Sequence, residues 1–172
     1  PPGRAVLVIF RGLPGTGKSH LVRQLVDARP GLHVLSRDEL RASVIPHPAF
    51  TEEEKTLVDD LVCSMAGFLL DRGRSVVIDG AALSSAARVE SLVQVGASRG
   101  FPVRIVECTC RQETALSRIA RDDGSHAAGD RGEALYFKVK SRFESIAHQA
   151  LIVDTDRPNS DNLGAILEYV RS

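Results

Sequence analysis

The sequence predicts an α/β fold in which helices cover both faces of a five-stranded parallel sheet. Short apolar runs alternate five times with segments of helical periodicity, which is the pattern of β-α-β units. No linker along the chain is long enough to separate domains. The length of 172 residues suits one domain spanning 1–172, with a core that needs neither a metal nor a disulfide.

Five short runs are predicted to be strands. The first, Ala5–Arg11, is apolar without interruption up to its last residue, which is typical of a strand buried on both faces. The second, at residues 33–35, is a short run that follows a Pro-Gly helix break. The later strands are predicted at residues 75–79, 102–109 and 151–154.

Helices are predicted between and after these strands. Residues 18–28 carry apolar side chains every three or four positions, and these would form one buried face. Thr51 and Glu54 form a capping box at the start of a long amphipathic helix that ends near Gly73. The other helices are predicted at residues 84–99, 112–121, 133–146 and 162–170.

Composition excludes several classes of protein. Twenty-two basic residues balance 22 acidic ones, so the chain lacks the net positive charge of a protein that grips long nucleic acid. A small phosphorylated substrate or a short nucleic-acid end is compatible with this balance. No apolar run reaches the ~18–20 residues that cross a bilayer, so we expect a cytoplasmic protein with no membrane partner. No obligate protein partner is evident, and three sparse cysteines favour reduced thiols.

The residues after the first predicted strand match the phosphate-binding pattern G-x-x-x-x-G-K-[ST] without a mismatch. Glycines permit backbone angles that let successive N–H groups face one anion, and the following helix adds its positive end. Lys18 is expected to reach the β- and γ-phosphates of ATP, while the Ser19 hydroxyl binds Mg²⁺. The alternative is a glycine-rich turn that binds nothing. The predicted nucleotide-binding residues here are Gly12, Pro14, Gly15, Thr16, Gly17, Lys18, Ser19 and His20.

Two aspartates follow predicted strands. Asp79 ends the third strand, where a second carboxylate can reach the metal or the substrate, although a turn or helix-capping aspartate is the alternative. Asp38 follows the second strand, where it can accept the proton of an attacking hydroxyl during γ-phosphate transfer. Ser36 or Asp38 could instead simply start a helix. Arg41 lies one helical turn after Asp38 and either binds an anionic part of the phosphate acceptor or lies in solvent.

Two arginines precede a polar, glycine-rich stretch. Arg118 and Arg121 are three residues apart and lead into residues 121–132, which we predict to be a lid that excludes water. Guanidinium groups at such a hinge can neutralise the charge that develops in phosphoryl transfer. The alternative is a solvated basic helix face.

These residues together resemble the P-loop kinases, and among them the kinase domain of 5′-polynucleotide kinases and related small-molecule kinases. The resemblance runs from Val6 to about Thr155. It implies a three-layer P-loop NTPase fold of the kinase type with a short arginine-bearing lid. It also implies transfer of the ATP γ-phosphate to an acceptor hydroxyl, with Mg²⁺. The motifs that carry it begin at Gly12, Ser36, Val76 and Arg118.

The resemblance assigns further roles. Asp38 would activate the acceptor hydroxyl and Arg41 would contact an acceptor phosphate. Arg88 matches a substrate-binding arginine at a shifted spacing, and Thr155 and Arg157 would border the adenine. Residues 80–82 replace a polar Asn or Thr of those relatives, so a nucleoside, sugar or antibiotic is an alternative acceptor. A nucleotide-hydrolysing switch is a further alternative. Such proteins usually have a water-orienting Gln or Glu near the third strand, and none follows Asp79 here.

Overall fold

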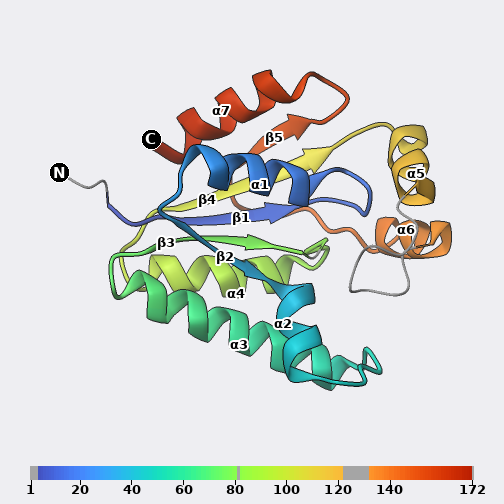
Figure 1. Ribbon diagram of the computed structural model, residues 1–172. Helices are drawn as coiled ribbons and strands as arrows, with labels where there is room; N and C mark the ends of the chain where they lie inside the picture. Colours follow the sequence, from blue (N-terminus) through green and yellow to red (C-terminus); the bar gives the residue numbers. More distant parts are fainter. Residues whose placement is uncertain (1–3, 81, 122–131, 172) are drawn as a thin grey trace.

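One parallel sheet forms the centre of the molecule (Figure 1). The structure is a computed structural model that describes residues 4–80, 82–121 and 132–171. Its strands are β1 (Leu7–Arg11), β2 (Leu32–Ser36), β3 (Ser75–Asp79), β4 (Val103–Thr109) and β5 (Ala150–Asp154). Their spatial order is β2-β3-β1-β4-β5, and every neighbouring pair is parallel. The chain leaves β1 and β3 toward opposite faces, so a crevice forms where these two strands end.

Helices cover both faces of the sheet. The elements are α1 (Lys18–Ala28), α2 (Arg37–Val44), α3 (Glu52–Leu70), α4 (Ala86–Ala97), α5 (Gln112–Arg121), α6 (Glu133–Lys140) and α7 (Asn159–Arg171). Helices α1 and α7 lie on one face and α3 and α4 on the other, while α5 and α6 lie beyond the carboxyl ends of the strands (Figure 1). The predicted three-layer α/β fold with a five-stranded parallel sheet is confirmed. The predicted lid falls mainly on residues 122–131, which lie outside the described residues.

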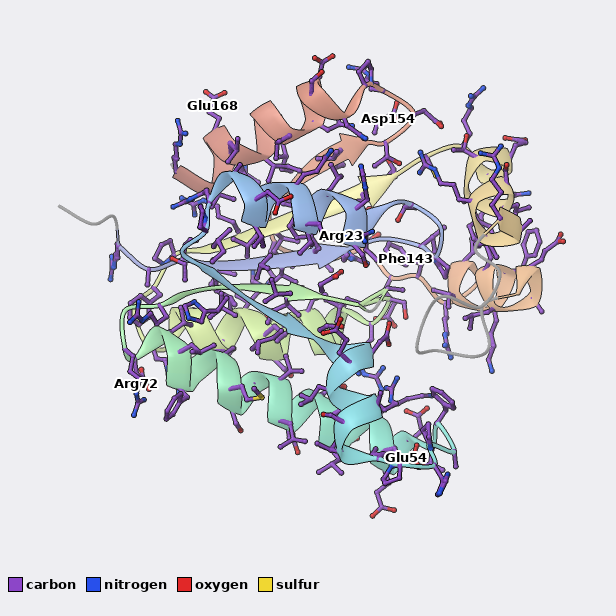
Figure 2. The ribbon with its side chains drawn as sticks, in the orientation of Figure 1. Arg23, Glu54, Arg72, Phe143, Asp154 and Glu168 are labelled. Carbon is purple, nitrogen blue, oxygen red and sulfur yellow. The ribbon has the colours of Figure 1, made fainter. Side chains whose placement is uncertain are left out.

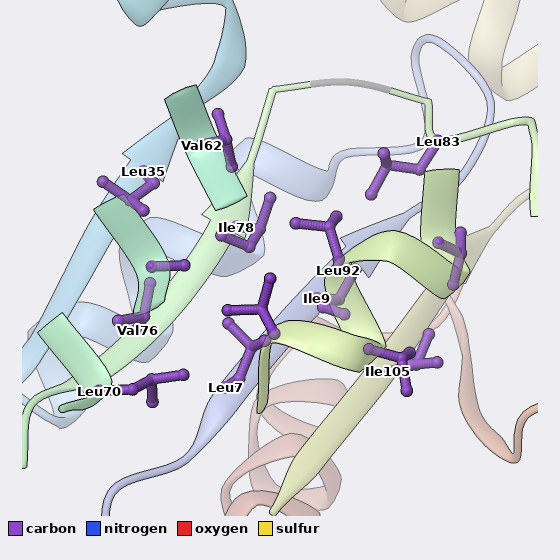
Figure 3. Close-up of a cluster of buried hydrophobic side chains, with 14 of the residues drawn as sticks. Leu7, Ile9, Leu35, Val62, Leu70, Val76, Ile78, Leu83, Leu92 and Ile105 are labelled. Atoms are coloured by element: carbon purple, nitrogen blue, oxygen red, sulfur yellow. The ribbon is translucent and has the colours of Figure 1, made fainter. Parts of the chain in front are cut away.

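The sheet has an apolar core on each face, which explains why apolar residues do not alternate with polar ones in β1. Leu7 and Ile9 point into the core under α3 and α4, which Figure 3 shows, whereas Val8 and Phe10 point into the core under α1 and α7. All four side chains are completely buried. Burial on both faces therefore selects a continuous apolar run, and β1 occupies the centre of the sheet.

Some element boundaries differ from the prediction. Helix α6 ends at Lys140 instead of continuing to residue 146. The backbone N–H of Glu144 donates to the carbonyl oxygen of Ser84 at 2.9 Å, and the Glu144 carboxylate accepts from the N–H of Ala86 at 2.6 Å. These bonds draw the chain across to the start of α4, so it cannot continue as a helix. Phe143 consequently lies between the end of β1 and α6 (Figure 2).

Other differences are smaller. Helix α7 begins at Asn159 and β2 runs to Ser36, each three residues or fewer from the predicted boundary. The segment after β2 forms the separate helix α2, whose start is capped by the Ser36 hydroxyl. Among the described residues, none of the helices has the length and apolar character needed to span a membrane.

Candidate active site

The loop between β1 and α1 can only be built from glycine at key positions. Gly15 and Gly17 have φ angles of +77° and +82°, in the left-handed region that side chains disfavour. A Cβ atom on Gly15 would lie 2.5 Å from the carbonyl oxygen of Ala115, and one on Gly12 would lie 2.4 Å from that of Cys108. The loop is therefore packed directly against the backbone of β4 and α5.

The start of α1 is suited to bind an anion. Gly17 is its N-cap residue, so no side chain caps the helix, and its first turn contains no acidic residue. By contrast, side-chain hydroxyls of Ser36 and Thr51 cap α2 and α3, whose first turns are acidic. Uncapped N–H groups and the positive end of the helix dipole are the elements of a phosphate site.

Lys18 and Thr16 make contacts within this loop. The Lys18 ammonium donates to the carbonyl oxygens of Gly12 at 2.8 Å and Leu13 at 3.0 Å. Thr16 is buried, and its hydroxyl donates to Leu13 at 2.7 Å. Thr16 thus stabilises the loop from behind, while Lys18 lines a cavity in front of it.

Ser19 and Asp79 meet at the crevice between β1 and β3. The Ser19 hydroxyl donates to Oδ1 of Asp79 at 3.2 Å, because β3 pairs directly with β1 and ends beside the loop. Hydroxyl and carboxylate oxygens are the ligands that Mg²⁺ prefers, usually one or two per site with phosphate oxygens completing the shell. The described residues contain no cluster of three or more His, Cys, Asp or Glu that could hold a metal alone. The pair therefore fits a metal held jointly with a nucleotide.

A cavity of about 640 Å³ joins this loop to the segment after β2. The predicted site residues that line it are Pro14, Gly15, Gly17, Lys18, Ser19, His20, Asp38, Arg41, Arg88 and Arg118. Gly12, Asp79 and Thr155 lie behind this lining and contact it through hydrogen bonds, and Thr16 is bonded in turn to Thr155. Arg121 and Arg157 are exposed and do not line it.

Arg118 is attached to the loop through Thr155. Its guanidinium donates to the hydroxyl and the carbonyl oxygen of Thr155, each at 2.9 Å, and to the carbonyl oxygen of Gly15 at 3.3 Å. The Thr155 hydroxyl in turn donates to the carbonyl oxygen of Thr16 at 2.9 Å. Arg157 instead pairs with Asp154 at 3.8 Å on the surface. The network fixes one arginine of α5 beside the loop.

Asp38 faces the cavity from the first turn of α2. The Ser36 hydroxyl accepts the hydrogen bond that caps this helix, from the N–H of Glu39 at 3.3 Å, so capping does not require Asp38. Arg41 lies one turn later, with a guanidinium nitrogen 3.7 Å from Oδ1 of Asp38, and it is almost completely buried. A carboxylate and an arginine thus occupy the same wall of the cavity.

A second carboxylate organises two further arginines on this wall. Asp59 of α3 pairs with Arg37 and lies 3.1 Å from Arg88. Burial lowers the pKa of the Arg37 guanidinium, and the negative charge of Asp59 opposes this effect. Asp59 therefore holds cationic groups at the cavity wall although it does not line the cavity itself.

Comparison with known proteins identifies the family to which the chain belongs. A family model described as an AAA domain matches residues 7–145. The chain belongs to this AAA domain family.

Several solved structures are similar to this AAA domain, and some of them are named as kinases. The APS kinase CysC of Mycobacterium tuberculosis, in complex with AMPPNP and APS, has a TM-score of 0.73 and 20% identity, covering 99% of this chain and 100% of that chain. The Pnkp1/Rnl/Hen1 RNA repair complex has a TM-score of 0.62 and 16% identity, covering 84% of this chain and 48% of that chain. The AAA domain therefore has the fold of the P-loop kinases, and the resemblance to that superfamily noted in the sequence is confirmed.

A curated relative shares part of the chain. The 2′,3′-cyclic-nucleotide 3′-phosphodiesterase of Pongo abelii is 33% identical to the AAA domain over 102 residues, which is 59% of this chain. The match spans 23% of that relative. It therefore compares one portion of a larger protein with this domain.

Sequence reasoning missed the strongly basic character of the cavity in this AAA domain. Nine of the described lining residues are Lys or Arg, and Asp38 is the one acidic side chain among them. The cavity also contains Phe50. The basic residues not anticipated are Arg23, Arg37, Lys55, Lys138 and Arg142. Lys138 and Arg142 could have been noticed in the sequence, because they lie four residues apart soon after the predicted lid. The neutral net charge of the chain, however, does not reveal that basic residues cluster in one place.

Proposed function

We propose that this AAA domain transfers the γ-phosphate of ATP to a hydroxyl group, and that the acceptor is the 5′-hydroxyl end of a polynucleotide. The observation that carries the proposal is one cavity that contains both the phosphate-binding loop with Lys18 and the carboxylate of Asp38. The nucleotide site alone would suit any P-loop protein. A carboxylate on the opposite wall supplies the group that prepares an alcohol for attack.

The reaction follows from these positions. The acceptor oxygen attacks the γ-phosphorus as its proton passes to the Asp38 carboxylate, and the bond from phosphorus to the β–γ bridging oxygen breaks to release ADP. Lys18 and Arg118 neutralise negative charge on the transferring group. Ser19 and Asp79 would hold Mg²⁺, which supplies further neutralisation of the phosphates. The chain thus acts mainly by positioning and by electrostatics.

The charge of the cavity supports an acceptor that is itself anionic. Arg41 and Arg88 lie on the wall with Asp38, and Lys138 and Arg142 line the side formed by α6 and the segment after it. This is more positive charge than one triphosphate requires, and a polynucleotide end brings phosphates close to its terminal hydroxyl. Each neutralised phosphate also makes binding sensitive to salt.

A small-molecule acceptor is the second candidate. The full-length structural match to a kinase crystallised with AMPPNP and APS favours it, as does the lack of a polar side chain at Gly80 and Ala82. Phosphate transfer to a small anionic alcohol would use the same residues in the same roles.

The test is transfer of radiolabelled γ-phosphate to a panel of 5′-hydroxyl oligonucleotides, nucleosides and sugars. Asp38→Asn should retain ATP binding and lose about 100-fold or more in turnover, because a general base of this kind contributes about 10²–10⁴-fold. Lys18→Ala should abolish transfer. Glu39→Gln is the matched control, since Glu39 is an exposed carboxylate next to Asp38 that does not line the cavity.

Two results would contradict the proposal. Unimpaired turnover in Asp38→Asn would remove the general base. Rapid ATP hydrolysis that no acceptor alters would indicate a nucleotide-driven switch instead of a kinase.

A further inference from the structure

Phe50 places an exposed aromatic ring at the mouth of the cavity. It lies in the segment between α2 and α3, lines the cavity together with Ala49, and is 41% exposed. Exposure of a large apolar side chain at a polar site costs the free energy that burial would recover. Among the described residues, Phe50 is the one aromatic (Phe, Tyr or Trp) side chain that lines the cavity.

The backbone holds Phe50 in an uncommon conformation. Its φ angle is +57°, in the left-handed region that a bulky residue disfavours. The Glu54 carboxylate accepts hydrogen bonds from the N–H groups of Ala49 at 3.0 Å and Phe50 at 2.6 Å, and Thr51 caps α3 immediately afterwards. Such conformations persist where surrounding contacts enforce them, often at ligand sites.

Arg41 connects this ring to the reacting end of the cavity. Its guanidinium carbon lies 5.2 Å from the centroid of the Phe50 ring, and a guanidinium nitrogen lies 3.7 Å from the Asp38 carboxylate. One arginine side chain therefore spans the distance between the ring and the carboxylate. Because Arg41 lies over the Phe50 ring and also approaches Asp38, a flat group stacked on the ring would lie within one arginine side chain of the carboxylate.

We propose that Phe50 is a stacking platform for an aromatic ring of the acceptor, and that it selects acceptors that carry a flat base next to the hydroxyl. The proposal rests on the proposed function, and it narrows the candidate acceptors to those that carry a base, since a sugar has no aromatic ring to stack. Stacking of a nucleic-acid base on an aromatic side chain tolerates any base, because every base has a π face.

A second aromatic–arginine pair shows that the pair alone does not mark a site. Phe68 of α3 is 56% exposed, and the Arg72 guanidinium lies 3.5 Å from its ring centroid. This pair is outside the cavity lining. Phe68 is therefore a matched control: it has the same residue type, similar exposure and the same kind of partner.

The experiment compares two 5′-hydroxyl oligonucleotides that differ only in the base of the first nucleotide, one intact and one abasic. The wild-type protein should have a kcat/KM about 10-fold lower on the abasic acceptor, which retains the hydroxyl and every phosphate. Phe50→Ala should lose about the same factor on the intact acceptor and nothing further on the abasic one. Phe50→Trp should retain the wild-type kcat/KM, Phe50→Leu should show the same loss as Phe50→Ala, and Phe68→Ala should match the wild type on both acceptors.

The outcomes separate the two proposals. Equal losses on both acceptors in Phe50→Ala, or wild-type behaviour of Phe50→Leu, would overturn the stacking role while leaving the kinase intact. Binding of an oligonucleotide with 2-aminopurine at its 5′ end gives a readout without turnover, since stacking quenches its fluorescence. Quenching by the wild type but not by Phe50→Ala supports the platform even if no phosphate is transferred. An absence of quenching by the wild type would refute it.

Discussion

The Ser19 hydroxyl donates a hydrogen bond of 3.2 Å to the carboxylate of Asp79, which joins the first turn of α1 to the end of β3. The two residues are 60 positions apart in the sequence. They meet because β3 is inserted beside β1 in the sheet. This pairing of strands places two oxygen donors at the crevice where the phosphate-binding loop begins its helix.

Removing the Ser19 hydroxyl or the Asp79 carboxylate should weaken the binding of Mg²⁺. We expect Ser19→Ala and Asp79→Asn to raise the Mg²⁺ concentration for half-maximal phosphate transfer by about 10-fold, because each removes a hard oxygen ligand or its charge. Titration of Mg²⁺ at saturating ATP measures this. Ser43→Ala is the control, since its hydroxyl is exposed and bonds within α2. An unaltered Mg²⁺ dependence in both variants would exclude the pair from the metal site.

Replacing Gly15 should disrupt the nucleotide site more than it disrupts the fold. Gly15→Ala adds a Cβ 2.5 Å from the Ala115 carbonyl oxygen at a φ of +77°, so the loop must shift and its N–H groups lose their alignment. We expect at least a 10-fold loss in ATP affinity by calorimetry. Gly31→Ala is the control, because its Cβ would have nothing within 4 Å. Equal ATP affinities in the two variants would contradict the role of the loop.

Removing the buried Arg11 side chain should strongly destabilise the fold. It is completely buried, pairs with Glu107 at 3.3 Å, donates to the Glu144 carbonyl oxygen at 2.8 Å, and lies 4.2 Å from the Phe143 ring centroid. Burial lowers the pKa of Arg11, which Glu107 opposes. Removing it leaves Glu107 without this partner and opens a void in the core.

We expect Arg11→Ala to lower the free energy of unfolding by about 3 kcal/mol in urea denaturation. Arg72→Ala should change it by less than about 0.5 kcal/mol, because Arg72 lies on the surface. A loss in Arg11→Ala no larger than in this control would mean that the buried network contributes little to stability.

Cys108 should make the protein sensitive to alkali. Burial raises the pKa of its thiol from 9.0 to about 12. The folded state therefore holds the proton more tightly than the unfolded chain, so stability is complete below pH 9 and decreases as the pH rises toward 12. Cys108→Ala should flatten this decrease. Denaturation measured at several pH values tests it, and equal slopes in the variant and the wild type would refute the assignment.

Local sequence was sufficient for much of the site. The run from Gly12 to Ser19 dictates its own shape, because left-handed glycines and an uncapped helix start are properties of neighbouring residues. The helix cap at Thr51 is local for the same reason, and the structure confirms it with a 3.2 Å bond from the Glu54 N–H to the Thr51 hydroxyl, although the Glu54 carboxylate accepts from Ala49 and Phe50 and not from Thr51. The continuous apolar run of β1 likewise reports its burial on two faces.

The tertiary structure alone decided what lies across the cavity from that loop. Phe50 and Asp59 carry no local signal, and each acquires its contacts with Arg41 or Arg88 from the packing of α2, α3 and α4. The end of α6 was mispredicted for the same reason, since the bond from Glu144 to Ser84 joins segments 60 residues apart. Hydrogen-bond patterns within a few residues can be read from spacing, whereas the grouping of positive charges in a neutral chain depends on which distant surfaces the fold brings together.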